Sequence, residues 1–194
     1  MALAKFAKPA GTWTYADLLD LPDDGKRYEI IDGELYELSS PLLRHAAAIM
    51  ALIELLLPLV KGMGGKLYTA SVDVRFAGAD PVVPDIMALL PGGRGRRVRR
   101  GIEGPPDLLI EVLSPSNRTH DTVRKRALYA RGGVREYWIV DPEAGSIEII
   151  GEDGEMVQRV VAPAAGEVAF ILRSPLLGEL AADAAELFPP DVED

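Results

Sequence analysis

Residues 108–113 read Leu-Leu-Ile-Glu-Val-Leu, and this run is apolar on both of the faces that a β-strand would present. A strand with one face in water alternates apolar and polar side chains, so the missing alternation predicts a central strand that is covered on both faces. Helical runs precede and follow it in the chain, and helices are the usual cover for such a strand. The run therefore predicts an α/β (α+β) sandwich built around a mixed sheet.

Local signals predict the elements around this strand. Asp32-Gly33 between two apolar runs predicts a hairpin of residues 28–31 with 34–38, and Ser39-Ser40-Pro41 caps a long helix. Because no repeat and no linker is visible, the 194 residues are expected to form a single domain with a peripheral tail at 175–194. Helices are expected at 14–19, 42–57, 121–131 and 179–187, and further strands at 67–76, 82–90, 136–140, 146–150, 156–161 and 168–172.

Composition excludes several classes of protein. The chain has no cysteine, so neither a disulfide framework nor a thiolate metal site is possible. Its first residues lack the continuous apolar core of a secretory signal. The most apolar run, residues 49–60, contains Glu54 and Pro58 and is shorter than the roughly 20 apolar residues of a membrane span. We therefore expect a soluble, cytoplasmic protein in which this run is a core helix.

The charges are unevenly distributed along the chain. The net charge is −9, yet residues 94–135 contain eleven basic and four acidic residues, a local balance of +7. Local potential, rather than total charge, governs the binding of polyanions, so this segment is a candidate nucleic-acid contact. The alternative is a solvated basic loop followed by an arginine-rich helix face. By its Gly and Arg content, the segment 91–101 is expected to be a mobile loop.

Two carboxylates interrupt apolar strands. Glu111 lies within the run described above, and Asp85 lies within the apolar run of residues 82–90. Burying an unpaired carboxylate is costly, so each needs a partner, a metal ion or a raised pKa. Two such acids on neighbouring strands would suit Mg²⁺, which prefers oxygen ligands, and the backbone carbonyl of Val112 could be a third ligand. The alternative is that each acid pairs with an arginine or lies at a strand end.

Several motifs follow one another in order: Tyr28-Glu-Ile-Ile-Asp-Gly-Glu34 with His45 after it, Pro84-Asp85, Pro106-Asp-Leu-Leu-Ile-Glu-Val-Leu-Ser-Pro-Ser116, Asp121-Thr-Val-Arg-Lys-Arg-Ala-Leu-Tyr129 and Gly133-Val-Arg-Glu-Tyr-Trp-Ile-Val-Asp-Pro142. Over about residues 14–142 this series resembles the Uma2 family. That family is assigned to the PD-(D/E)XK superfamily of restriction-like nucleases. The resemblance implies a restriction-endonuclease-like core with an extra N-terminal hairpin and C-terminal strands.

The resemblance also assigns roles to individual residues. It places the PD motif on Pro84-Asp85 and the second acid on Glu111, but Leu113 stands where the superfamily has its lysine. Lys125 is the natural substitute, because relocation of this lysine to a helix is a known variation in the superfamily. There it could orient the attacking water or offset charge on the phosphate. The alternative is an ordinary helix pair between Asp121 and Lys125.

Three further residues are weighed for the same site. Glu34 could be a third acid near the metal ion, or could simply be solvated. His45 opens a helix, where it could contact phosphate or water at the metal, although a single histidine is more often structural. Tyr129 lies one turn after Lys125 and is expected to be a core or site-wall residue rather than a catalyst.

The expected function is Mg²⁺-dependent, or Mn²⁺-dependent, hydrolysis of DNA phosphodiester bonds, without a small-molecule cofactor and with a homodimer as the expected assembly. The alternative is a catalytically weak or inactive module that binds DNA or protein, because a fold does not fix an activity. Phosphate contacts carry no sequence information, so the target is not readable. The residues expected to contact the DNA backbone are Arg94, Arg96, Arg97, Arg99, Arg100, Arg118 and Arg124, with Arg126 beside them.

Overall fold

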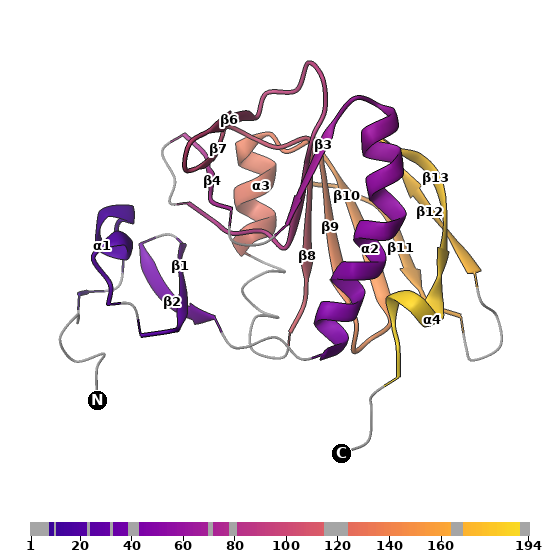
Figure 1. Ribbon diagram of the computed structural model, residues 1–194, viewed down its shortest axis with the longest axis horizontal. Coiled ribbons are helices and arrows are strands. Elements are labelled where there is room, and N and C mark those ends of the chain that lie inside the picture. Colours follow the sequence, from indigo (N-terminus) through magenta and orange to yellow (C-terminus); the bar gives the residue numbers. More distant parts are fainter. Residues whose placement is uncertain are drawn as a thin grey trace.

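The computed structural model of the chain describes residues 8–9, 11–22, 24–31, 33–38, 43–69, 72–77, 81–114, 124–163 and 169–190, and a six-stranded sheet forms its centre (Figure 1). The strand order is β11-β10-β9-β8-β5-β3. β8 and β9 run parallel and the other neighbours run antiparallel, so the sheet is mixed. Every residue of β8 is buried, which confirms the predicted central strand. The strands are β3 Lys66–Thr69, β5 Ile86–Leu89, β8 Leu108–Val112, β9 Glu136–Asp141, β10 Ser146–Gly151 and β11 Met156–Val161.

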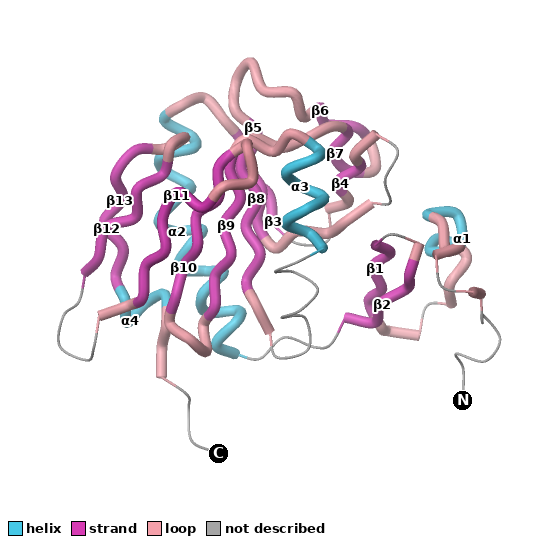
Figure 2. Tube along the Cα trace, turned by 180° about the vertical axis from the view of Figure 1, so that it is seen from behind, coloured by secondary structure: helices cyan, strands magenta, loops and turns pink. Residues whose placement is uncertain are grey.

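One helix covers each face of this sheet (Figures 1 and 2). α2 (Leu43–Gly62) packs on one face through residues such as Leu52, and α3 (Arg126–Gly132) packs on the other through Tyr129. α2 continues through Pro58 and ends at Gly62, a little beyond the residue 57 expected for its end. By length and composition alone α2 could cross a membrane, but its buried stripe packs on the sheet, as expected for a core helix.

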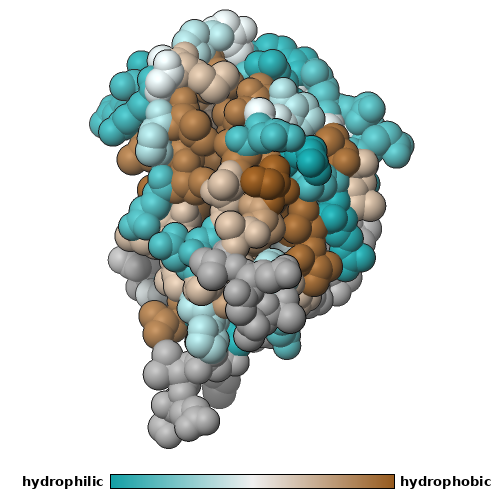
Figure 3. Space-filling model, turned by 90° about the vertical axis from the view of Figure 1, so that its right-hand side faces the viewer, coloured by the Kyte–Doolittle hydropathy of each residue, from teal (hydrophilic) through white to brown (hydrophobic). Residues whose placement is uncertain are grey.

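The C-terminal elements correct one prediction. Residues 179–187 were expected to be helical, but β13 (Gly178–Asp183) pairs with β12 (Ala169–Ser174), and only α4 (Ala184–Leu187) is a helix. The reason is an alternating burial pattern along β13, and the Asp183 side chain then caps α4 by accepting from Ala185 N–H at 2.8 Å. Apolar residues also gather on the outer side of the molecule that carries these strands (Figure 3).

The basic segment is also more ordered than its composition predicts. Instead of one mobile loop, it contains β6 (Arg96–Val98) and β7 (Gly101–Glu103), which join β4 (Val74–Arg75) in a three-stranded sheet beside α3. The cause is Ile102, which is 2% exposed and packs in the core between the sheet and α3. Gly101 adopts a φ of 125° against the carbonyl of Asp73, where a Cβ would not fit.

The N-terminal elements agree with their local signals and lie to one side of the central sheet (Figure 1). Thr14 and Asp17 form the expected capping box of α1 (Tyr15–Leu19). β1 (Arg27–Ile31) and β2 (Glu34–Leu38) form the predicted hairpin. The predicted cap at residues 39–41 lies outside the described part of the chain.

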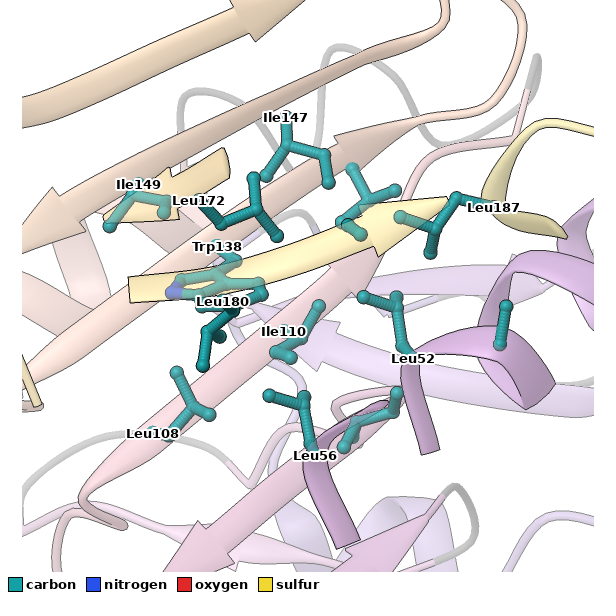
Figure 4. Packing of buried hydrophobic residues seen from close by; sticks show 14 of the residues in the cluster. Leu52, Leu56, Leu108, Ile110, Trp138, Ile147, Ile149, Leu172, Leu180 and Leu187 are labelled. Carbon is teal, nitrogen blue, oxygen red and sulfur yellow. The ribbon is translucent and has the colours of Figure 1, made fainter. Parts of the chain in front are cut away.

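The largest apolar cluster lies between the central sheet and α2 (Figure 4). Leu52 and Leu56 of α2 contact the sheet side that carries Ile110 and Trp138. Leu180 and Leu187 belong to the same cluster, so the segment expected as a peripheral tail contributes to the main core. A second cluster on the opposite face lies under α3 and holds the aromatic rings that are described with the site below.

Candidate active site

The two predicted acids lie at one end of the neighbouring strands β5 and β8. Glu111 is the fourth residue of β8, and Asp85 directly precedes β5. The antiparallel register pairs Ile86 with Ile110, so its continuation by one residue places Asp85 opposite Glu111. Alternation along β8 places Glu111 on the face of Leu109, which is the face that α3 covers, while the Asp85 side chain, one residue beyond the paired positions, contacts Val112 N–H and His45 of α2.

Asp85 is held by the neighbouring strand and by α2. Its Oδ2 accepts the backbone N–H of Val112 at 2.8 Å, and His45 Nε2 lies 3.5 Å from the same oxygen. The Asp85 side chain keeps 18% of its surface exposed, so it is accessible from solvent. His45 Nδ1 is buried and makes no hydrogen bond within the described residues. Nε2 of His45 therefore faces Asp85, while Nδ1 has no hydrogen-bond partner within the described residues.

Glu111 is buried, and α3 and the turn before it each supply a contact to its carboxylate. Lys125 Nζ lies 3.1 Å from Oε2, and the Tyr129 hydroxyl donates to Oε1 at 2.6 Å. The side chains of Glu111 and Lys125 keep 3% and 4% of their surface exposed. Lys125 lies in a π-helical turn that leads into α3, and Tyr129 follows four residues later on the same face.

Leu113, directly after β8, stands where a lysine was expected, and Lys125 contacts Glu111 instead. Leu113 itself is buried in the apolar cluster under α3. Lys125 belongs to the turn before that helix, and its Nζ reaches Glu111 from there. Asp121, the alternative partner of Lys125, lies outside the described residues. The geometry thus brings Lys125 to the second acid, and its chemical role remains a prediction.

Glu34 is connected to the same turn through Arg124. Arg124 Nη1 donates to Glu34 Oε2 at 2.8 Å and to the Tyr36 hydroxyl, and its guanidinium lies 5.5 Å from the Tyr36 ring centroid. Burial and a hydrogen bond to Glu34 raise the pKa of the Tyr36 hydroxyl, so the phenol stays neutral at physiological pH. These contacts fasten β2 to the residue next to Lys125.

The predicted DNA-contacting arginines divide into two groups. Arg94 donates to the carbonyl of Gly133 and lies 2.5 Å from Glu152, and Arg96 pairs with Glu103. The side chains of Arg97, Arg99 and Arg100 are exposed, and within the described residues they make no ion pair or hydrogen bond. Arg126 donates to the carbonyl of Gly154 at 2.9 Å, and Arg118 lies outside the described residues.

An open groove runs between the edge of the central sheet and the arginine-rich hairpin of β6 and β7, residues 96–103, which we call the basic hairpin. Its volume is about 860 Å³. Its lining combines basic, aromatic and aliphatic side chains, which is a composition that suits an extended polyanion with bases. The lining residues are Tyr68, Val72, Leu89, Gly95, Arg96, Arg97, Val98, Arg99, Gly101 and Ile102.

The donor set of Asp85 and Glu111 fits a hard divalent cation. Within the described residues, no group of three or more His, Asp or Glu side chains is arranged to hold a metal ion. Mg²⁺ does not need such a group, because it keeps several waters and usually binds through one or two carboxylates together with substrate phosphate. The two acids and the carbonyl of Val112 therefore suit Mg²⁺ or Mn²⁺ better than an ion that requires an all-protein cage.

Sequence reasoning missed one contact. The hydrogen bond from Tyr129 to Glu111 joins residues that are far apart in the chain, and the tyrosine was expected only to line the site. The signal that could have found it is the four-residue spacing from Lys125, which places both side chains on one helix face. The phenol hydroxyl is the part that spacing alone does not assign, because a phenylalanine would fill the same helix position.

Comparisons with known proteins agree with this fold. The family model described as "Uma2: Putative restriction endonuclease" matches residues 15–184. A crystal structure of a "putative nuclease belonging to DUF820" from Anabaena variabilis superposes with a TM-score of 0.71 at 21% identity, and the match covers 90% of this chain and 97% of that one. At this identity the likeness concerns the fold. No curated protein sequence matches the chain.

Proposed function

The chain belongs to the Uma2 family, and on that premise we propose that it is a Mg²⁺-dependent, or Mn²⁺-dependent, endonuclease that hydrolyses DNA phosphodiester bonds. The observation that carries the proposal is the grouping at one end of β5 and β8. Asp85 stands opposite Glu111 in register, and Lys125 Nζ lies 3.1 Å from Glu111 Oε2. Two acids can hold a divalent cation that activates water and stabilises charge on the phosphate, and a lysine beside them adds a positive point charge.

Each residue has a distinct part in the proposed reaction. Asp85 and Glu111, with the carbonyl of Val112, would hold the cation, which lowers the pKa of water and stabilises negative charge on the phosphate. Lys125 would orient the attacking water or offset charge at the phosphate as a point charge. His45, whose Nε2 lies 3.5 Å from Asp85 Oδ2, would contact the phosphate or an ordered water beside Asp85. Glu34 supports the site through Arg124.

The DNA backbone would be met by the exposed arginines of the basic hairpin and by the groove beside them. Arg97 and Arg99 line that groove together with Tyr68, an arrangement that provides charge for phosphates and a ring on which a base can stack. A homodimer is the proposed assembly. It is supported by the apolar residues on the outer side of the C-terminal strands, where Ile171 is 40% exposed (Figure 3).

The test compares wild type with Asp85→Asn, and uses Glu148→Gln as the matched control. Glu148 is a half-buried carboxylate on β10 that pairs with Arg159, and in register it lies two strands from Glu111. We expect wild type to nick or linearise plasmid DNA with Mg²⁺ and to bind Mn²⁺ in a calorimetric titration. Asp85→Asn should lose at least about 10-fold in Mn²⁺ affinity together with cleavage, and Glu148→Gln should retain both.

Leu113 supports a second candidate function, because a buried apolar side chain stands where the superfamily has its lysine. This function is a catalytically weak or inactive module on a nuclease fold that binds DNA or protein. Wild-type protein that binds DNA, but neither binds Mn²⁺ nor cleaves with Mg²⁺, would favour this module over the endonuclease.

A further inference from the structure

Tyr129 is fixed in place more firmly than a residue that only lines a site. Its side chain is 1% exposed, and its ring packs between Phe76 at 5.8 Å and Tyr137 at 4.9 Å between centroids. The Tyr137 contact is edge-on, a favourable geometry for two aromatic rings. Because a phenol has only two side-chain torsions, these contacts determine where its hydroxyl lies. That position is 2.6 Å from Glu111 Oε1.

The two carboxylate oxygens of Glu111 contact different groups. Oε1 accepts from the Tyr129 hydroxyl, and Oε2 faces Lys125 Nζ. A lysine has a flexible four-carbon stem and a rotatable ammonium, so it follows a carboxylate more readily than it orients one. The rigid phenol is therefore the group that sets the rotation of the Glu111 carboxylate. An ionised carboxylate offers about four acceptor positions, so a hydrogen bond to one oxygen does not by itself prevent the group from binding a cation.

We propose that Tyr129 is a positioning residue for Glu111, which holds the carboxylate in the orientation that a divalent cation and Lys125 both use. This inference rests on the proposed function, because it assumes that Glu111 is a metal ligand. Partners that orient metal ligands through hydrogen bonds commonly contribute 10- to 100-fold to metal affinity. A tyrosine that merely fills the core would contribute to stability and leave metal affinity unchanged.

Tyr129→Phe separates these roles, because it keeps the ring between Phe76 and Tyr137 and removes only the hydroxyl. The control is Tyr15→Phe, since the Tyr15 hydroxyl also donates to a carboxylate, Asp73 Oδ2 at 2.7 Å, but not to Glu111. Mn²⁺ binding is measured by calorimetry and by the electron paramagnetic resonance signal of free Mn²⁺. Both are measured at a temperature where circular dichroism shows every variant folded. We expect Tyr129→Phe to weaken Mn²⁺ binding about 10-fold and Tyr15→Phe to leave it unchanged.

A second measurement supports the first and does not depend on the stability of the variant. In DNA cleavage, Tyr129→Phe should require about 10-fold more Mn²⁺ for half-maximal rate, while KM for DNA at saturating Mn²⁺ stays at the wild-type value. Equal Mn²⁺ affinity of wild type and Tyr129→Phe would overturn the positioning role and leave the proposed nuclease intact. Failure of wild type itself to bind Mn²⁺ would overturn both.

Discussion

At the scale of single residues, the buried pair of Glu111 and Lys125 is costly to fold. Each charge is almost wholly withdrawn from water, and desolvation of such ions costs several kcal/mol apiece. The cost is offset when they face each other and when Tyr129 donates a further hydrogen bond. Replacement of such a buried pair by well-packed apolar residues is often neutral or stabilising, which agrees with a pair that serves chemistry rather than stability.

Lys125→Met should therefore destabilise the protein as well as stop cleavage. Removal of one partner leaves the buried Glu111 carboxylate uncompensated, and we expect a loss of about 3 kcal/mol in the free energy of unfolding, measured in urea at pH 7. The double variant Lys125→Met with Glu111→Gln removes both charges and should recover most of this loss. If Lys125→Met unfolds at the wild-type urea midpoint, the two groups are not a coupled buried pair.

The residues of the site were predictable to the extent that local pattern reveals them. Asp85 and Glu111 stand out because a charge interrupts an apolar run, and burial makes that arrangement costly. The contacts of Lys125 and Tyr129 were not readable in full, because they depend on how α3 packs over β8. Tertiary packing also decides which of the two oxygens of Glu111 each group meets. No spacing in the chain encodes that choice.

At the scale of elements, α3 lies between the candidate active site at its first turn and the contact of Arg94 at its last residues. The turn that carries Lys125 precedes it, and Gly133 caps it in the left-handed conformation with a φ of 78°. Arg94 donates to the carbonyl of this same glycine and thereby ties the basic segment to the far end of the helix. About 10 Å of helix separates this contact from Lys125, at 1.5 Å per residue.

Gly133→Ala should lower stability, and Gly62→Ala should not. Both glycines lie at the C-terminal end of a helix, but only Gly133 has a positive φ, and its added Cβ would lie 3.0 Å from the Arg94 guanidinium. A left-handed alanine costs roughly 1–2 kcal/mol, whereas an alanine at Gly62 has open space around it and should gain up to about 1 kcal/mol. Urea unfolding measures both. A stabilising Gly133→Ala would contradict the assigned cap.

Elements were predictable where periodicity and capping agree, as in α1 and the first hairpin. Elements were not predictable where composition indicates one structure and packing against the core requires another. The Arg- and Gly-rich segment suggests a mobile loop, but the single buried Ile102 is enough to fix a β-hairpin on β4. The same competition acts at β13, where the helix-forming residues Glu179, Leu180 and Ala181 extend because alternate side chains meet the core.

At the scale of the whole molecule, the layered fold followed from the apolar strand at residues 108–113, and the uneven charge now has a location. The hairpin of β6 and β7 lies beside α3, and Arg97, Arg99 and Arg100 project from it without an ion-pair partner among the described residues. Chain order could not predict this split between paired and unpaired arginines. It arises because Glu103 and Glu152 are brought to Arg96 and Arg94 by folding.

The unpaired arginines should make DNA binding sensitive to salt despite a net charge of −9. Each phosphate contact contributes roughly −0.9 to the slope of log affinity against log salt concentration on duplex DNA. The triple variant of Arg97, Arg99 and Arg100 to Ser should therefore flatten that slope by up to about 3 units, measured by fluorescence anisotropy in Mg²⁺-free buffer. Its urea midpoint should stay at the wild-type value, because exposed side chains without partners contribute little to stability.

The control for this prediction carries the same change in net charge at a different place. Arg131, Arg159 and Arg173 are exposed residues outside the basic hairpin, and their triple Ser variant also removes three positive charges. If the hairpin is the contact, the control keeps the wild-type salt slope, because screening confines each charge to its own neighbourhood of about 10 Å at 0.1 M salt. Equal flattening in both variants would mean that total charge, rather than the hairpin, governs binding. An unchanged slope in the hairpin variant would show that its arginines are only solvated.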